Sequence, residues 1–312
     1  MMTSDFQPGQ TLRLGTRGSP LAMAQAVETK QRIAAAAPQV GIEIVDIKTT
    51  GDKVVDRRLA EIGGKGLFTK ELDDALLDGR IDFGVHSMKD METWLPDGIE
   101  IAAVLPREDP RDALVSYVAN SIDSLPKGAV IGTASLRRQA QLLARRPDLS
   151  VVMFRGNVQT RLEKLARGEA AATFLATAGL NRLGVEIDAV TPLETDTMLP
   201  AVAQGAIAIT VRAGDDRTRG IVALLNDAET AARTATERGF LAALDGSCRT
   251  PIAGLAELSG DGSKIMFRGL VVRPDGSGLM TVADEGPVED AEEIGLRAGR
   301  VVRPKMDRGY FE

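Results

Sequence analysis

The sequence contains only one cysteine and one histidine in 312 residues. One cysteine cannot form an internal disulfide, and the first ten residues lack the basic and apolar regions of a secretory signal, so we expect a protein of the reducing cytoplasm. One histidine excludes a zinc site built from several histidines, and the carboxylates form no obvious replacement, so no metal is expected. No run of about 18 apolar residues is present, which excludes a membrane-spanning helix.

The chain also lacks an excess of positive charge. Its net charge is -6, which makes non-specific binding to nucleic acid a poor hypothesis. Arginines nevertheless gather locally, as Arg137-Arg138 and again at Arg155 and Arg161. A focused basic site in an acidic protein indicates a small anionic ligand. Solvated surface charge is the alternative for any single arginine.

The apolar pattern predicts a globular α/β protein. Short apolar runs alternate with helical segments from residue 12 to about residue 183, which predicts a mainly parallel sheet in each of two lobes. A late strand at Ile207–Val211 is expected to return to the first lobe. From about residue 229 a helix and several strands predict a third, small α+β part.

Two turns in the two halves share one design. Gly15–Leu21 and Gly132–Arg138 both place Gly-Thr, a short turn and a serine cap between a strand and a helix, with arginine nearby. Such turns lie at the carboxyl edge of an open sheet, where free helix N–H groups attract anions. Plain helix capping is the alternative, but two matched copies favour a cleft that holds an anion from both lobes.

Three further segments carry candidate chemistry. His86–Asp90 follows a buried strand and brings together an imidazole, a hydroxyl, an ammonium and a carboxylate, and Asp90 could stabilise a developing cation. A polar loop with a capping aspartate is the alternative. Gly63–Gly66 is too short for a phosphate-binding loop and predicts a lid with one lysine or a surface turn. Around Cys248, local features leave a buried hydrophobe and a reactive thiol both open.

Taken in order, these segments resemble the porphobilinogen deaminases (hydroxymethylbilane synthases). The resemblance covers nearly the whole chain, and its motifs are Thr16–Ala22, Gly63–Phe68, Val85–Asp90, Arg107–Asp112, Gly132–Arg138, Arg155–Val158, Leu199–Gly205 and Gly246–Cys248.

This resemblance implies two periplasmic-binding-protein-like (type II) lobes around a cleft, followed by a small C-terminal α+β domain. The implied boundaries are 9–105 plus 206–223 for the first lobe, 111–199 for the second and 228–312 for the third domain. It also implies that Cys248 carries a dipyrromethane cofactor through a thioether. Four porphobilinogen units are then condensed with loss of ammonia, and hydroxymethylbilane is released by hydrolysis.

By the resemblance, Asp90 is the catalytic carboxylate that stabilises the cationic azafulvene. The carboxylate side chains of the pyrroles suit bidentate arginines. The residues expected to bind cofactor or substrate are Arg17, Ser19, Lys65, His86, Ser87, Lys89, Thr133, Ser135, Arg137, Arg138, Arg155, Gly156, Asn157, Arg161, Arg182 and Gln204. His86 is expected to shape the site rather than to act as a base. The chain departs from the family pattern at Glu61, at Met91-Glu92 and at Arg249-Thr250.

Two other functions compete with this interpretation. A non-catalytic anion-binding protein would use the same lobes but leaves Cys248 and the third domain unexplained. A thiol acyltransferase would pair Cys248 with His86 and would carry no permanent adduct. The expected partner is the small molecule porphobilinogen, with no nucleic acid, membrane or obligate protein partner, and the resemblance suggests a monomer.

Overall fold

The computed structural model describes residues 10–50, 69–246 and 250–311. The chain divides into two compact units. The first contains Met1–Val54, Gly64–Arg107 and Ala206–Ala231, and the second contains Val55–Gly63, Glu108–Gly205 and Ala232–Glu312. Within the described ranges, no helix is long and apolar enough to cross a membrane.

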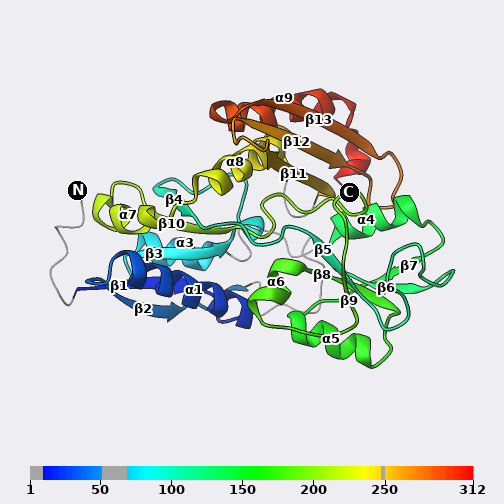
Figure 1. Ribbon diagram of the computed structural model, residues 1–312, viewed down its shortest axis with the longest axis horizontal. Helices are drawn as coiled ribbons and strands as arrows, with labels where there is room; N and C mark the ends of the chain where they lie inside the picture. The colour runs from blue at the N-terminus through cyan, green and yellow to red at the C-terminus, as the bar shows by residue number, and fades with distance from the viewer. Residues whose placement is uncertain (1–9, 51–68, 247–249, 312) are drawn as a thin grey trace. The chain divides into compact units, whose positions relative to one another are not determined.

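The first unit is built on a five-stranded sheet of order β2-β1-β3-β10-β4 (Figure 1). Its strands are β1 (Thr11–Thr16), β2 (Gly41–Asp46), β3 (Phe83–Ser87), β4 (Ile99–Val104) and β10 (Ile207–Arg212). The β1 strand runs parallel to β2 and β3, whereas β10 is antiparallel to both β3 and β4. The expectation that a late strand returns to the first lobe is therefore confirmed.

Within the described residues, three helices accompany this sheet, and the start of the first follows from the sequence. They are α1 (Pro20–Ala36), α3 (Lys70–Leu77) and α7 (Asp216–Val222). The hydroxyl of Ser19 accepts a hydrogen bond from the Ala22 N–H, and Pro20 fills the first helical position. The core lies between α1 and the sheet, where Leu14 and Ile33 are fully buried.

The second unit contains a five-stranded sheet with the corresponding order, β7-β6-β8-β5-β9. Its strands are β5 (Asp112–Val115), β6 (Val130–Gly132), β7 (Ser150–Val152), β8 (Ala172–Ala176) and β9 (Val190–Pro192). The expectation of mainly parallel sheets is confirmed for the strand directions, because four of the five strands in each sheet run the same way and β10 or β5 runs against them. In each, two pairings are parallel and two are antiparallel, because β5 and β10 enter from outside the strand–helix–strand succession.

The helices described beside the second sheet are α4 (Leu136–Arg145), α5 (Val158–Ala166) and α6 (Thr177–Arg182). Two of them, α4 and α5, begin at polar residues that cap them. The Ser135 hydroxyl accepts from the Arg138 N–H, and the Asn157 side chain accepts from the Thr160 N–H. Both caps were expected from the sequence, because serine and asparagine oxygens replace the missing acceptors of the first helical turn.

The small α+β part predicted for the C-terminus is present in the second unit. Its antiparallel strands β11 (Ile252–Leu258), β12 (Lys264–Val271) and β13 (Met280–Pro287) pack with α8 (Ala228–Ala243) and α9 (Ala291–Val302). The rings of Phe240 and Phe267 lie 5.0 Å apart in this core. Short 3-10 helices occur at Met88–Asp90, Ala223–Leu225, Val288–Asp290, Arg303–Lys305 and Arg308–Tyr310.

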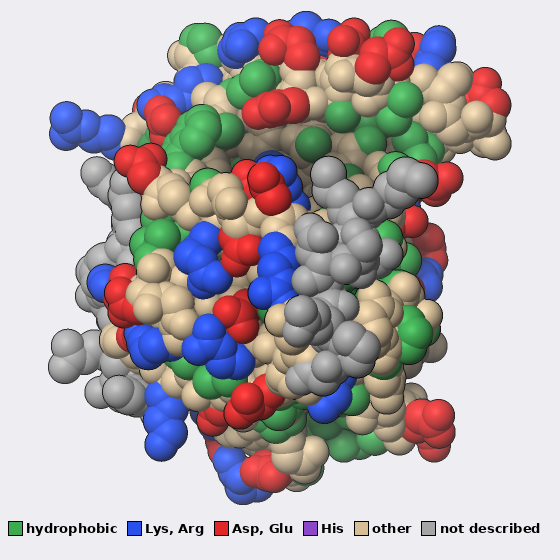
Figure 2. All heavy atoms as spheres, turned by 90° about the vertical axis from the view of Figure 1, so that its left-hand side faces the viewer, with side chains coloured by type: hydrophobic (Ala, Val, Ile, Leu, Met, Phe, Trp, Pro, Cys, Tyr) green, Lys and Arg blue, Asp and Glu red, His purple; other side chains and the backbone are tan. Residues whose placement is uncertain are grey.

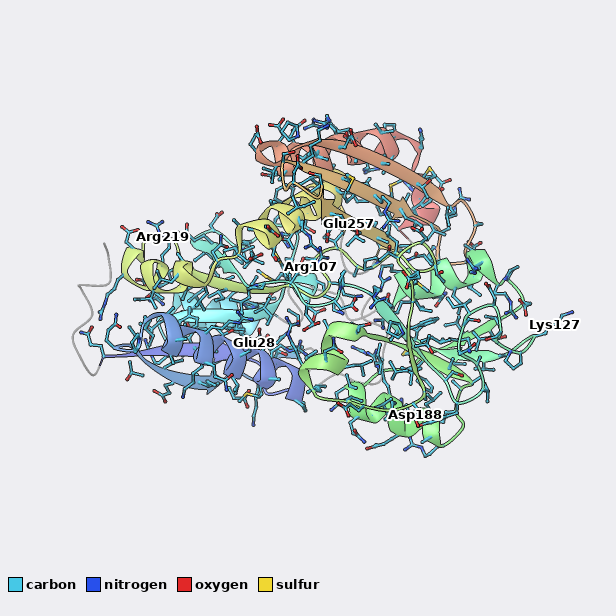
Figure 3. The ribbon with its side chains drawn as sticks, in the orientation of Figure 1. Glu28, Arg107, Lys127, Asp188, Arg219 and Glu257 are labelled. Carbon is cyan, nitrogen blue, oxygen red and sulfur yellow. The ribbon has the colours of Figure 1, made fainter. Side chains whose placement is uncertain are left out.

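The face shown in Figure 2 intersperses Lys and Arg side chains with Asp and Glu. Several exposed charges form ion pairs. Glu28 on α1 and Arg219 on α7 are labelled in Figure 3; Glu28 pairs with Arg32, and Arg219 pairs with Glu100 and Asp216. Such exposed pairs contribute little to stability or recognition. Selective binding of an anion must therefore depend on particular sites in the fold and not on these surface charges.

Candidate active site

In the first unit, polar segments gather at one edge of the sheet. The parallel strands β1, β2 and β3 end at Thr16, Asp46 and Ser87, so the residues that follow them share this edge. Arg17 and Ser19 follow β1, and the segment ending at Asp90 follows β3. The carboxyl ends of parallel strands are where open α/β sheets bind ligands.

His86 is buried and neutral at this edge. Its exposed fraction is 7%, and its Nε2 lies 3.0 Å from the Thr210 hydroxyl on β10. Burial, with a smaller contribution from the positive charge of Arg17, lowers the pKa of His86 to about 4. A neutral ring held in this way shapes the site and is a poor general base near pH 7.

Ser87 is held by a residue that the sequence did not single out. The Gln25 amide of α1 donates to the Ser87 hydroxyl at 2.8 Å, and the hydroxyl donates back to the Gln25 carbonyl oxygen at 3.1 Å. Gln25 is only 3% exposed. The sequence did carry a signal for Gln25, because this polar side chain stands at a helix position that faces the sheet. A buried amide at such a position requires hydrogen-bond partners.

Asp90 ends a 3-10 helix that is fixed by apolar contacts. Met88 and Met91 on either side are 4% and 7% exposed, and the Met88 N–H donates to the Ala206 carbonyl at 3.0 Å. Lys89 is half-buried, whereas Asp90 itself is exposed. The departure from the family pattern at Met91 therefore keeps a buried anchor directly after Asp90, and the carboxylate remains accessible to a ligand.

The second unit repeats this arrangement at its own sheet edge. The parallel strands β7, β6 and β8 end at Val152, Gly132 and Ala176. Thr133 follows β6, and its buried hydroxyl accepts from the Ser135 N–H at 3.1 Å. The matched turns expected from the sequence are therefore both present, each at the carboxyl edge of a sheet.

Arg137 and Arg138 form a buried cluster with Asp112 and Gln204, called here the arginine cluster. The Nη2 atoms of Arg137 and Arg138 donate to the two Asp112 carboxylate oxygens, each at 2.6 Å. The remaining Nη1 atoms donate at 2.7 Å to backbone carbonyls, of Leu199 for Arg137 and of Phe174 for Arg138. Asp112 is fully buried, and it fixes the direction of both guanidinium groups.

The arginine cluster keeps an excess of positive charge. Burial lowers the pKa of Arg137, and the carboxylate of Asp112 opposes this shift. A guanidinium remains protonated in proteins, so two cations share one anion. Each guanidinium has five N–H donors, and the hydrogen bonds to Asp112, Leu199 and Phe174 use two donors of Arg137 and three of Arg138. The cluster is therefore suited to a further carboxylate.

The other predicted arginines lie near the ends of α5 and α6. The Arg161 Nε donates to the Gly156 carbonyl at 3.0 Å, and the Arg182 Nη2 donates to the Gly205 carbonyl at 3.0 Å. Arg155 is half-buried directly before Gly156. Gly156 has a φ of +117°, and a Cβ there would lie 2.7 Å from the Cβ of Thr160. Only glycine fits this turn between Arg155 and the Asn157 cap.

Two predicted residues lie outside the described ranges. They are Cys248, the expected attachment point of the cofactor, and Lys65. The family departures at Glu61 and Arg249 lie there too. No group of residues suited to a metal ion occurs within residues 10–50, 69–246 and 250–311.

A buried hydroxyl near the arginine cluster tests the fit of a carboxylate-bearing cofactor. Thr177 is 6% exposed, directly follows β8, and its Oγ1 has no hydrogen-bond partner among the described residues. A buried hydroxyl without a partner costs free energy unless a ligand or water satisfies it. Together with the donors of the arginine cluster, it fits a ligand that carries acceptor oxygens.

Comparisons with known proteins agree with this chemistry. Residues 12–220 match the family model described as "Porphobilinogen deaminase, dipyromethane cofactor binding domain", and residues 231–302 match "Porphobilinogen deaminase, C-terminal domain". The porphobilinogen deaminase of Paracoccus denitrificans is 54% identical over 313 residues, which cover 100% of this chain and 99% of that protein. The chloroplastic porphobilinogen deaminase of Oryza sativa is 52% identical over 96% of this chain and 86% of its own length.

Among solved structures, the effector-binding domain of BenM with benzoate is similar at a TM-score of 0.43. The two chains are 17% identical, and the match covers 76% of this chain and 94% of that one.

Proposed function

The chain belongs to the porphobilinogen deaminase family, and from this premise we propose which of its residues bind and which act. It is a transferase that uses porphobilinogen and a dipyrromethane cofactor. The observation that carries the assignment of roles is the pair of polar sheet edges, one with an exposed carboxylate and the other with buried arginines. The cofactor supplies the pyrrole carbon to which substrate units are joined, and we propose Cys248 as its attachment point.

We propose that the arginine cluster recognises carboxylates of the cofactor and of the growing pyrrole chain. The guanidinium groups of Arg137 and Arg138 are pre-oriented by Asp112, so little side-chain entropy is lost when a carboxylate binds. Arg17, Arg155, Arg161 and Arg182 would bind further carboxylates. The sheet edge of the second unit would be lined by Thr133, Ser135, Gly156, Asn157 and Gln204. The sheet edge of the first unit would be lined by Ser19, Lys65, His86, Ser87 and Lys89.

Asp90 is proposed as the catalytic carboxylate. Loss of ammonia from porphobilinogen leaves positive charge on the substrate, and an exposed carboxylate on a rigid 3-10 helix can stabilise that charge. The same group can hold a proton of the pyrrole nitrogen. Lys89 beside it would orient a substrate carboxylate. His86 stays neutral and supports the site through Thr210.

The alternative of a Cys248–His86 acyltransferase finds little support in the site. A thiolate–imidazolium pair requires a protonated histidine, whereas the His86 pKa of about 4 keeps the ring neutral. A non-catalytic anion-binding protein would need no exposed Asp90. The expectations of a cytoplasmic monomer, of a cleft between the lobes and of the three domain boundaries stay predictions.

The decisive experiment is the intact mass of the purified protein. We expect an excess equal to two linked pyrrole units, lost in Cys248→Ala. An unmodified mass in active protein would refute the assignment of Cys248. A persistent excess in Cys248→Ala would place the attachment at another residue.

A further inference from the structure

The segment Leu199–Gly205 has an unusual backbone. Ala203 has a φ of 58°, in the left-handed region, and Gly205 has a φ of 91°. A Cβ on Gly205 would lie 2.3 Å from the Glu108 carbonyl oxygen, so only glycine fits there. Alanine rarely adopts a positive φ, and such a conformation persists where the surrounding structure holds it. The segment must therefore be stabilised by specific contacts.

Glu237 of α8 supplies the central contact. Its exposed fraction is 0%. One carboxylate oxygen, Oε2, accepts from the Ala203 N–H at 2.6 Å, and the other, Oε1, accepts from the Ala256 N–H of β11 at 2.9 Å. Hydrogen bonds of backbone N–H groups to a buried carboxylate are short and strong. Through these two hydrogen bonds, Glu237 of α8 connects the Ala203 turn with β11.

The residue after Ala203 connects this turn to the arginine cluster. Gln204 is fully buried, and its Nε2 donates to the Asp112 Oδ1 at 3.0 Å and to the Pro110 carbonyl at 2.8 Å. Asp112 Oδ1 is the same oxygen that accepts from Arg138. A continuous series of contacts therefore leads from Glu237 to the guanidinium groups.

Both ends of the segment also touch arginines directly. The Leu199 carbonyl accepts from the Arg137 Nη1 at 2.7 Å, and the Gly205 carbonyl accepts from the Arg182 Nη2 at 3.0 Å. Any shift of the Ala203 turn would therefore displace acceptors of two arginines proposed to bind carboxylates. The position of this backbone and the direction of the arginines are set together.

We propose that Glu237 is a positioning residue for carboxylate recognition. By holding Ala203 in its left-handed conformation it places Gln204 against Asp112, and Asp112 then fixes Arg137 and Arg138. The inference rests on the proposed function of the arginine cluster and extends it to a residue that touches neither substrate nor cofactor.

The test is a double-mutant cycle between Glu237→Gln and Gln204→Ala in the full chain. Glutamine keeps the shape of Glu237 but turns an N–H₂ group toward one of the two backbone N–H donors. We expect the KM for porphobilinogen to rise about tenfold in each single variant, with kcat within about threefold of the parent. If Glu237 acts through Gln204, the double variant should be within about twofold of the worse single variant.

A rescue and a control separate positioning from a general loss of stability. Ala203→Gly adopts a positive φ without strain, so adding it to Glu237→Gln should restore most of the KM. Ile294→Val removes one buried methyl group from the same C-terminal core and should lower the melting temperature without changing the KM. If Glu237→Gln does not fold, Glu237→Asp, which keeps the charge but shortens the reach, should show the same KM rise.

Hydrogen exchange gives a readout that is independent of activity. A peptide covering residues 199–205 should exchange faster in Glu237→Gln than in the parent, and Ile294→Val should leave it protected. Unchanged exchange, or KM effects that add fully in the double variant, would overturn the inference while leaving the function of Gln204 intact. A Gln204→Ala variant with an unchanged KM would overturn the proposed role of Gln204 and this inference with it.

Discussion

At the scale of single residues, the aspartates at the two sheet edges, Asp90 in the first unit and Asp112 in the second, have opposite environments. Asp112 is fully buried and both of its oxygens are occupied by arginines, whereas Asp90 is exposed at the end of a 3-10 helix. A carboxylate that is locked by two guanidinium groups can orient them but has little freedom to exchange protons. This contrast supports the proposal that Asp90 has the chemical role and Asp112 the organising role.

Asp90→Asn should retain cofactor and substrate binding but lose turnover. The amide has the shape of the carboxylate and lacks the charge that stabilises a developing cation, so kcat should fall by roughly 10²- to 10⁴-fold. Single-turnover kinetics and intact mass on the same preparation measure the two properties separately. Near-normal turnover would remove Asp90 from its assigned role.

His86 should make stability depend on pH. Its folded pKa of about 4 lies below the ordinary value of 6.5, so the unfolded state binds more protons between these values. Stability from this group is present above pH 6.5 and is lost as the pH falls toward 4, by up to about 3 kcal/mol.

Asp73 acts in the opposite direction, because burial raises its pKa to about 6. Its contribution to the free energy of unfolding therefore falls as the pH rises from 4 to 6. Both proteins contain Asp73, so its contribution to the pH dependence of stability cancels when the parent is compared with His86→Gln. On going from pH 7.5 to pH 5, urea unfolding should show a greater loss of stability in the parent than in His86→Gln, and equal changes would contradict the buried neutral histidine.

The residue scale also marks a limit of sequence reasoning. The sequence indicated that Arg137 and Arg138 bind anions, but their partner Asp112 lies far away in the chain, inside a motif whose first residues are mostly polar. Pairing between separate segments depends on tertiary structure, which local patterns do not encode. The same applies to Gln25 and Glu237, whose partners are reached only across elements.

At the scale of elements, local sequence signals correctly predicted where helices begin. The caps at Ser19, Ser135 and Asn157 were predicted correctly because cap chemistry depends on neighbouring residues alone. The strand β5 was missed, since it has four residues and begins with an aspartate. The antiparallel β10 was foreseen only as a late strand, and its direction follows from tertiary pairing.

Gly156→Ala, just before α5, should be more destabilising than a matched control just after the same helix, Gly168→Ala. Both Gly156 and Gly168 have positive φ, but a Cβ on Gly156 would overlap Thr160, whereas none of the described atoms lies within 4 Å of one on Gly168. Alanine at Gly168 should cost about 1 kcal/mol, and alanine at Gly156 should cost at least 1 kcal/mol more. Urea denaturation of both variants measures the difference, and equal losses would contradict the crowding of this turn.

At the scale of the whole molecule, the first unit is discontinuous in the chain. Its sheet takes four strands from residues 11–104 and its fourth position from β10 at Ile207–Arg212. Residues Ile207, Ile209 and Val211 are fully buried in this core. The sheet therefore lacks an interior strand until the later segment joins it.

Truncation should reveal this dependence. A fragment of residues 1–205 should leave β3 and β4 without their common partner, and the amides of β1 and β3 should exchange rapidly. A fragment of residues 1–231, which restores β10 and α7, should recover protection in these strands. Slow exchange in the shorter fragment would show that the sheet closes without β10.

The interior position of β10 also has a consequence for the order of events during synthesis. The ribosome completes the first hundred residues well before it reaches residue 207, so β3 and β4 must wait without their common partner while the second sheet is translated. This waiting period is set by translation speed. In the cell, slow codons or an arrest between residues 107 and 206 would therefore lengthen the exposure of the amino-terminal strands to chaperones and proteases.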